Sequence, residues 1–182
     1  QGYPGIRSTM DPAYLAPRSL LLRRIFGECF GLFGKAELES CDFSIVSLPP
    51  DELTPGQRIP HHDSPEAGLI ALLHFTGAAE TGGTAFYRHR RTGYEAILPE
   101  RAFAYAAAVG EDDRAFGPAQ PHYCHGSDER YEMIGEIEAK PDRAIIYRGR
   151  LLHSGHIPIP PVPETARESG RLTINTFIVG HP

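Results

Sequence analysis

The sequence contains no long hydrophobic run. A helix that crosses a bilayer needs about eighteen or more consecutive apolar residues, and no segment of this 182-residue chain approaches that length. We therefore expect no membrane partner. The chain also has no excess of positive charge, because 18 lysines and arginines stand against 23 aspartates and glutamates. Its basic cluster Arg88-His89-Arg90-Arg91 is isolated, so we expect no nucleic-acid partner either.

Cysteine is also scarce. The three cysteines, Cys29, Cys41 and Cys124, form an odd set at wide spacings. This pattern fits neither a disulfide framework nor a zinc site built from paired cysteines. We therefore expect a reducing compartment, and the localisation that we predict is cytoplasmic.

Glycine and proline are abundant. The 19 glycines and 17 prolines together make 36 of the 182 residues, which is typical of many short strands joined by turns. At 41% hydrophobic residues, the chain can bury a sizeable core. The composition predicts a β-rich fold, and the length fits a single domain over 1–182.

Eight segments have the length and residue pattern of strands, and they lie at 43–48, 57–63, 69–75, 84–89, 94–98, 133–138, 144–147 and 171–179. Few helices lie between them. The pattern therefore predicts an antiparallel sandwich or barrel with a core over about 43–179.

The segment 11–33 is expected to be helical. Asp11 would cap the helix and Pro12 would occupy its first position, while glycines further along break the pattern into one or two short helices. An apolar face of these helices would pack on a sheet. We therefore interpret 1–42 as helical N-terminal support.

A second helix is predicted over 99–109, where an alanine-rich run begins at a proline and stops at Gly110. Two long polar or proline-rich loops are expected at 111–131 and 157–170. Loops of this length in a compact domain often form functional rims.

The run His61-His62-Asp63 carries the first chemical signal. Residues two apart in a strand face the same side, so His61 and Asp63 would project together while His62 points the other way. They would offer a nitrogen and a carboxylate oxygen to one metal ion. Taken alone, the run also fits a polar turn in which Asp63 caps the next segment.

The segment 144–156 supplies two candidates for a third ligand. His153 and His156 follow an apolar strand, and His153 follows it more closely. Two histidines and one carboxylate on one face are the facial triad of non-haem Fe(II) oxygenases, which leaves coordination positions open. Each histidine alone would more often be an ordinary hydrogen-bonded side chain.

The last strand carries a possible anion clamp. Alternation places Arg171, Thr173 and Asn175 on one face, with Leu172 and Ile174 on the other. A guanidinium offers a planar fork for a carboxylate, and threonine adds one more donor. This pattern indicates a cosubstrate with a distal carboxylate, although Arg171 alone would usually be a solvated strand charge.

In this order the motifs resemble the Fe(II)/2-oxoglutarate-dependent dioxygenase superfamily, in particular its prolyl-hydroxylase-like branch and related bacterial proteins. The resemblance covers about 43–179. It rests on His61-x-Asp63, the strand 69–75 with the turn Thr81-Gly82-Gly83-Thr84-Ala85-Phe86, the strand before His153, and Arg171-x-Thr173.

The resemblance implies a double-stranded β-helix, which is a cupin-like jelly roll with the metal inside its mouth. It implies that His61, Asp63 and His153 hold Fe(II), with His153 preferred to His156 because it precedes Ser-Gly as in the family. It also implies that Arg171 and Thr173 bind the far carboxylate of the cosubstrate 2-oxoglutarate.

Two other segments contain histidines that could act as metal ligands. His122, Cys124 and His125 lie at spacings that could hold zinc with one more donor, but the sequence lacks a second convincing pair. We interpret this segment as a loop at the pocket rim. His74 shares its strand face with Ile70 and Leu72, so a core histidine is the preferred interpretation.

The sequence thus predicts an Fe(II)- and 2-oxoglutarate-dependent oxygenase, with dioxygen and an unidentified small molecule or peptide as substrates. Two alternatives remain open. One is a cupin-like module that binds a metal or ligand without turnover, and the other is a cupin enzyme that does not use 2-oxoglutarate. The pair Arg171-x-Thr173 favours the oxygenase, because a structural metal does not need it.

Overall fold

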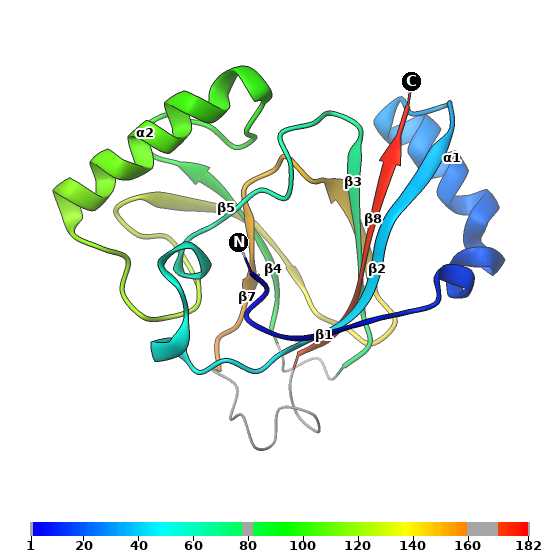
Figure 1. The fold of residues 1–182 in the computed structure, drawn as a ribbon, viewed down its shortest axis with the longest axis horizontal. Coiled ribbons are helices and arrows are strands. Elements are labelled where there is room, and N and C mark those ends of the chain that lie inside the picture. Colours follow the sequence, from blue (N-terminus) through cyan, green and yellow to red (C-terminus); the bar gives the residue numbers. More distant parts are fainter. Residues whose placement is uncertain (1, 78–81, 160–170, 182) are drawn as a thin grey trace.

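The computed structural model describes residues 2–77, 82–159 and 171–181, and its strands form two separate antiparallel sheets (Figure 1). The larger sheet has the order β1-β2-β8-β3-β6, and the smaller has the order β5-β4-β7. The predicted mainly β class is therefore confirmed. The strands are β1 (Gly5–Thr9), β2 (Ala36–Val46), β3 (Leu69–Phe75), β4 (Gly83–His89), β5 (Tyr131–Glu138), β6 (Ala144–Arg148), β7 (His153–His156) and β8 (Leu172–Gly180). The helices are α1 (Ser19–Phe30) and α2 (Pro99–Phe116), with short 3-10 helices at Pro12–Arg18, Pro50–Glu52 and Pro55–Arg58.

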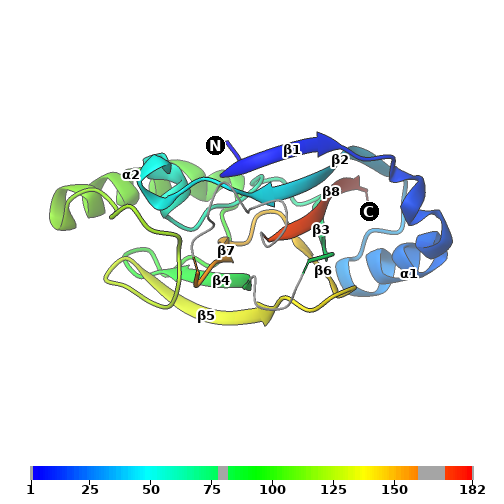
Figure 2. The ribbon, with the colours of Figure 1, turned by 90° about the horizontal axis from the view of Figure 1, so that it is seen from below.

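The two sheets lie as layers, with a helix packed on the outer face of each. Figure 2 shows β1, β2 and β8 in one layer and β7, β4 and β5 in the other. On the outer face of the larger sheet, Phe26 of α1 and Leu32 pack against Ile70 of β3 and Ile178 of β8. These contacts leave the opposite face of the larger sheet turned toward the smaller sheet.

The helix α2 covers the outer face of the smaller sheet. Its Tyr105 packs in one buried cluster with Ala85 and Tyr87 of β4 and Tyr131 of β5. Because side chains alternate along a strand, Thr84 and Phe86 of β4 face the space between the sheets.

The register of the larger sheet determines which side chains share its inner face. Arg7 pairs with Ser44, Ser44 with Thr173, and Thr173 with Phe75, which makes one row across four strands. Directly paired residues project to the same side of a sheet. Thr173 therefore lies on the inner face with Arg171, as the alternation predicts.

The predicted first helix is confirmed, although its neighbours are strands. The Asp11 side chain accepts a hydrogen bond from the backbone N–H of Ala13 at 2.8 Å, and Gly31 ends α1 at a φ of 69°. The interpretation of 1–42 as purely helical support was wrong, because β1 and most of β2 lie within it. Ile6 and Leu38 on these strands are 50% and 46% exposed. The apolar residues of β1 and early β2 therefore show no alternation with burial that would predict these strands.

The second helix is longer than predicted. It continues through Gly110 to Phe116, so the loop expected at 111–131 begins at Gly117. One glycine inside a helix costs only about 1 kcal/mol. The buried carboxylate of Asp112 bonds His89 of β4 at 2.8 Å, and this contact holds the added turns against the sheet.

The strand predicted over 57–63 was wrong. Pro55–Arg58 forms a 3-10 turn in which Thr54 and Gln57 make a capping box. Pro60 then removes a backbone donor, and only His61 forms an isolated bridge, to His153. The strand predicted over 94–98 is likewise reduced to a bridge between Ala96 and Leu151.

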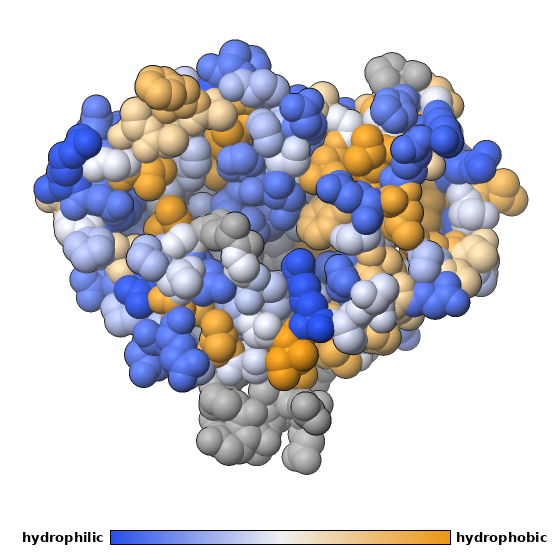
Figure 3. Space-filling view, viewed as in Figure 1, coloured by the Kyte–Doolittle hydropathy of each residue, from blue (hydrophilic) through white to orange (hydrophobic). Residues whose placement is uncertain are grey.

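Some expected features lie at the limits of the described residues. Thr81 of the predicted turn and most of the loop 157–170 fall outside them. Within the described part of the chain, no helix is long and apolar enough to cross a membrane. Hydrophilic and hydrophobic residues are interspersed on the face shown in Figure 3.

Candidate metal centre and anion pocket

A cavity of about 600 Å³ lies between the two sheets. The inner face of the larger sheet, the segment around residue 62 and the inner side of β7 form its walls. Polar and charged side chains in its lining include Arg7, His61, Asp63, His153, Arg171 and Asn175. The candidate ligands from distant parts of the sequence therefore share one cavity.

His61, Asp63 and His153 meet in this cavity. One potential ligand atom from each lies within 4.8 Å of the others. His61 Nε2 is 3.8 Å from Asp63 Oδ1, and His153 Nε2 is 3.6 Å from Asp63 Oδ2. These separations exceed hydrogen-bond length, and they leave room for an ion between the three groups.

Backbone pairing positions the two histidines. The N–H of His61 donates to the carbonyl of His153 at 2.9 Å, and the reverse bond is 2.8 Å. Their ring centroids are consequently only 4.5 Å apart. This single bridge, and not the predicted strand, therefore directs the His61 side chain into the cavity.

A second hydrogen bond orients the ring of His153. Its Nδ1 lies 2.8 Å from the carbonyl of Leu151, which can only accept. Nδ1 therefore carries a proton, and Nε2 is directed toward Asp63. A metal-binding histidine commonly has this second bond to a carbonyl or carboxylate.

The electrostatics of the site favour a neutral ring at His61. Burial lowers the pKa of His61 well below its ordinary value, and the nearby His153 lowers it further. Burial raises the pKa of Asp63, while the charges of His153 and Arg7 oppose that rise. Asp63 Oδ2 is buried and has no hydrogen-bond partner. The three groups could therefore hold a metal ion between them.

The guanidinium of Arg171 lies in the same cavity and links the two sheets. Its Nη2 donates to the carbonyl of Gly83 at 3.1 Å and to Thr84 Oγ1 at 3.3 Å. Its Nε is buried and unpaired, and no described carboxylate forms an ion pair with it. Burial lowers the pKa of Arg171, which reflects the cost of holding this charge away from water.

Thr173 is fully buried next to Arg171 on β8. Its hydroxyl donates to the carbonyl of Ser44 at 3.5 Å. This long bond leaves the oxygen as an acceptor on the inner face. The structure therefore brings Arg171 and Thr173 together on the inner face, as the sequence predicts.

The metal ligands and the arginine lie one strand repeat apart, which is a spacing of two residues along β7. Arg171 Cζ would be 3.7 Å from a Cβ on Gly155, and His153 is two residues earlier on β7. On β4, Thr84 and Phe86 pair with Gly155 and His153 respectively. Two residues along a strand span about 6.6 Å, a distance that a five-carbon diacid can bridge.

A family model matches residues 1–178 of this chain, and its description is a family of unknown function (DUF6445). The chain belongs to that family. No curated protein matches the sequence. The matched region of this DUF6445 protein includes the three candidate ligands and Arg171.

His62 and His156, which the sequence does not favour as ligands, lie away from the candidate metal centre. The ring of His62 turns toward Tyr105 of α2, with ring centroids 6.4 Å apart. His156 Nδ1 contacts a carboxylate oxygen of Glu136 on β5. The structure thus groups His153, and not His156, with His61 and Asp63.

The zinc alternative receives no support from the described residues. His122 and His125 stack at 5.6 Å, but they belong to no group of three potential ligands. Cys124 is buried in the apolar cluster below α2, and burial raises the pKa of its thiol to about 11. A thiol that stays protonated is a poor metal ligand. The adjacent Tyr123 lines the cavity, so the segment does lie at its rim.

His74 lies on the outer face of β3. Its ring stacks on Tyr14 at 6.3 Å, with the two planes 8° apart. The ring is therefore turned away from the cavity, in agreement with its interpretation as a packing residue.

Three residues near the site carried no signal in the sequence. Tyr147 and Phe86 lie against the ring of His153, at centroid distances of 4.8 and 6.4 Å. Tyr3 lines the cavity from the N-terminal segment. Aromatic residues in strands usually fill a core, so nothing in the pattern distinguished these three.

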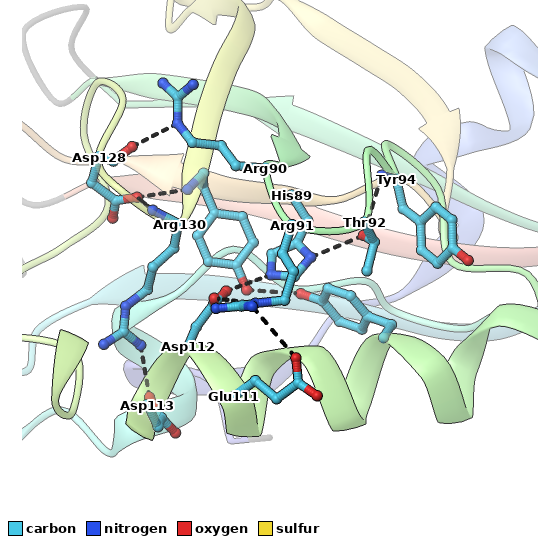
Figure 4. Close-up of polar contacts among 12 residues, drawn as sticks. His89, Arg90, Arg91, Thr92, Tyr94, Glu111, Asp112, Asp113, Asp128 and Arg130 are labelled. Carbon is cyan, nitrogen blue, oxygen red and sulfur yellow. Dashed lines mark hydrogen bonds and ion pairs between the residues drawn. The ribbon is translucent and has the colours of Figure 1, made fainter. Parts of the chain in front are cut away.

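A second buried polar cluster lies below α2, outside the cavity. Figure 4 shows Asp112 of α2 between His89 and Arg91. His89 Nε2 is 2.8 Å from Asp112 Oδ2, and Arg91 Nε donates to Asp112 Oδ1 at 2.6 Å. The ring's other nitrogen is 2.9 Å from Thr92 Oγ1. This cluster is fully paired and attaches α2 to the smaller sheet.

Proposed function

We propose that this protein is an Fe(II)- and 2-oxoglutarate-dependent oxygenase that hydroxylates its substrate. The observation that carries the proposal is one cavity with two complementary sets of polar groups. Asp63 and two histidines converge there, and one strand repeat away the buried Arg171 forms no ion pair with a described carboxylate. A metal ion and a diacid would satisfy both sets together.

The order in which the chain visits the two sheets supports a jelly roll. Besides the edge strand β1, the larger sheet contains β2, β3, β6 and β8, and the smaller contains β4, β5 and β7. The His61 segment adds an eighth position beside β7 through its bridge to His153. Two four-membered layers with antiparallel neighbours are the arrangement expected of a double-stranded β-helix. The proposed metal would lie between them.

The donor set fits Fe(II). Two imidazole nitrogens and one carboxylate oxygen on one side of an ion form the facial triad, which leaves positions open for small ligands. When bound there, the iron would supply activation of dioxygen, with decarboxylation of 2-oxoglutarate to succinate and CO2. His61, Asp63 and His153 would hold the ion, and the Leu151 carbonyl would keep Nε2 of His153 directed at it.

The remaining side chains would orient the cosubstrate and exclude water. Arg171 would take the far carboxylate, replacing an unpaired buried charge with a charge-assisted pair. Phe86 and Tyr147 form an apolar wall beside His153, and their rings pack at 5.4 Å. Such a wall shields reactive species from bulk water.

The test is iron-dependent formation of succinate from 2-oxoglutarate, followed by anaerobic titration of the iron-loaded protein with 2-oxoglutarate. Arg171→Ala should retain iron and weaken 2-oxoglutarate binding by roughly one to three orders of magnitude. Arg171→Lys should recover only part of the affinity, because an ammonium lacks the planar fork. Arg143→Ala is a matched control, since that arginine bonds the Glu138 carbonyl at the surface.

Each alternative predicts a different result. A wild-type protein that binds iron without binding 2-oxoglutarate would be a cupin-like metal site, and the proposal would be abandoned. Iron-dependent oxygen consumption without succinate would indicate a cupin enzyme with another cosubstrate.

A further inference from the structure

The N-terminal segment before β1 is held firmly against the cavity. The Pro4 carbonyl accepts backbone N–H bonds from Ser47 and Leu48, at 3.2 and 3.4 Å. The side chain of Gln57 donates to the carbonyl of Gly2 at 2.8 Å. These contacts fix the residue between them, Tyr3, as part of the cavity wall.

The side chain of Tyr3 is packed on both sides of its ring. Arg7 lies over the ring with its Cζ 4.4 Å from the centroid. The ring also packs against the apolar cluster that contains Val46, Leu53 and Tyr123. A cation over an aromatic face adds to this fixation. Packing of the ring therefore sets the position of the hydroxyl.

The hydroxyl of Tyr3 is buried and forms no well-oriented hydrogen bond, although Thr173 and Arg171 lie close enough to interact with it. It lies beside Arg171 and Thr173, whose side chains influence its ionisation. Burial raises the pKa of Tyr3 against the opposing charge of Arg171, so the hydroxyl remains a proton donor at neutral pH. An unpaired buried donor destabilises a protein unless a ligand satisfies it.

Tyr123 shows that this arrangement is specific to Tyr3. Both tyrosines contact the same apolar cluster and line the same cavity. The Tyr123 hydroxyl donates to the carbonyl of Leu48 at 2.7 Å. Tyr3 Oη and Arg171 Nε are instead two buried donors on neighbouring side chains, and neither has a well-oriented acceptor. Two such donors together suit a group with two acceptor oxygens.

We propose that Tyr3 donates a hydrogen bond to the far carboxylate of 2-oxoglutarate alongside Arg171, so that the N-terminal segment completes the cosubstrate pocket. This inference rests on the proposed function, because it takes the diacid as the occupant. It assigns a binding role to a residue outside the motifs at 61–63, 153 and 171–173. Arg7 holds the Tyr3 ring in place and adds a second positive charge to this side of the cavity.

The test is calorimetric titration of the full Mn(II)-loaded chain with 2-oxoglutarate. Tyr3→Phe keeps the ring and removes only the hydroxyl, and it should weaken binding by about ten- to hundredfold. Tyr123→Phe is the matched control and should bind 2-oxoglutarate as the wild type does. The probe 2-oxobutanoate has the same keto acid end without the far carboxylate, so Tyr3→Phe should leave its affinity unchanged.

The outcomes separate this inference from the proposed function. Failure of the wild-type protein to bind 2-oxoglutarate overturns both. Binding by the wild type that Arg171→Ala weakens and Tyr3→Phe does not would overturn the role of Tyr3 alone. Equal losses of 2-oxoglutarate and 2-oxobutanoate in Tyr3→Phe would also overturn it, because the hydroxyl would then not act on the far carboxylate. Unchanged Mn(II) affinity of Tyr3→Phe verifies that the variant is folded.

Discussion

Two groups of histidine and aspartate lie on opposite faces of the smaller sheet, and they differ in whether their polar atoms are paired. Below α2, His89 and Asp112 are 2.8 Å apart, and Arg91 and Thr92 satisfy their remaining atoms. In the cavity, Asp63 lies 3.6 Å or more from both histidines, and its Oδ2 has no partner. The same residue types therefore form a closed network in one place and an open one in the other.

The difference separates a structural contact from a binding site. A fully satisfied buried network rigidifies its surroundings, whereas an unsatisfied one costs free energy until a ligand enters. Accessibility follows the same division. The side chains of His89 and Asp112 are 0% and 3% exposed, whereas those of His61, Asp63 and His153 are 38%, 15% and 6% exposed. Only the open group can be reached by an ion.

The largest expected effect comes from breaking the closed group. Asp112→Ala leaves His89 and Arg91 without their acceptor, and it should lower the free energy of unfolding by about 3 to 5 kcal/mol. Chemical denaturation at neutral pH measures this change. Glu111→Ala is the matched control, because its exposed pair with Arg91 at 3.4 Å contributes less than about 1 kcal/mol. Equal losses of stability in Asp112→Ala and Glu111→Ala would show that the buried network contributes no more than the exposed ion pair.

Removing the carboxylate of the open group should abolish metal binding. Asp63→Ala deletes the oxygen ligand, so Fe(II) affinity should fall by more than roughly a hundredfold, the upper range for residues that only support a ligand. Anaerobic titration with Fe(II) measures this loss. His62→Ala should retain iron, because that ring faces Tyr105. Full iron occupancy in Asp63→Ala would remove Asp63 from the site.

In the metal-free protein, the unpaired carboxylate of Asp63 should lower the free energy of unfolding. Asp63→Asn replaces an unpaired buried carboxylate, so we expect the free energy of unfolding without metal to rise by about 1 kcal/mol. The pKa of Asp63 is raised in the folded state, so ionisation of this group destabilises the fold above that pKa. The gain should therefore be present at neutral pH and disappear as the pH falls to about 4. A variant less stable than wild type at neutral pH would show that Asp63 stabilises the fold.

The smallest effect is expected at Cys124. Its thiol is buried and protonated, so Cys124→Ala should leave the Fe(II) affinity unchanged. The same anaerobic titration provides the measurement. A loss of metal specific to this variant would instead support the zinc interpretation of His122, Cys124 and His125.

Much of the strand pattern could be predicted because it is local. The prediction for 69–75 coincides with β3, and those for 84–89, 133–138, 144–147 and 171–179 lie within one or two residues of β4, β5, β6 and β8. In these segments, runs of apolar and β-branched residues end at turn residues. The edge strand β1 and the first part of β2 have exposed side chains, and only their backbone pairing reveals them.

The candidate site shows the same limit. Alternation correctly placed Arg171 and Thr173 on one face, because β8 is a regular strand. For His61 and Asp63 the predicted strand was wrong, yet the two side chains still share the cavity. His61 is directed by one bridge to His153 across 92 residues, and Asp63 by a backbone hydrogen bond to Gly149 at 2.7 Å. No local pattern contains either contact.

The sequence by itself determined the mainly β class, the capped first helix and the residue types available for metal and anion binding. It determined these because strand alternation, helix caps and ligand chemistry depend on near neighbours in the chain. Only the tertiary structure decided that Tyr3, Asp63, His153 and Arg171 share one cavity, and that Asp112 is paired where Asp63 is not. Burial and hydrogen-bond partners arise from contacts between distant segments, so they exist only once the two sheets have packed.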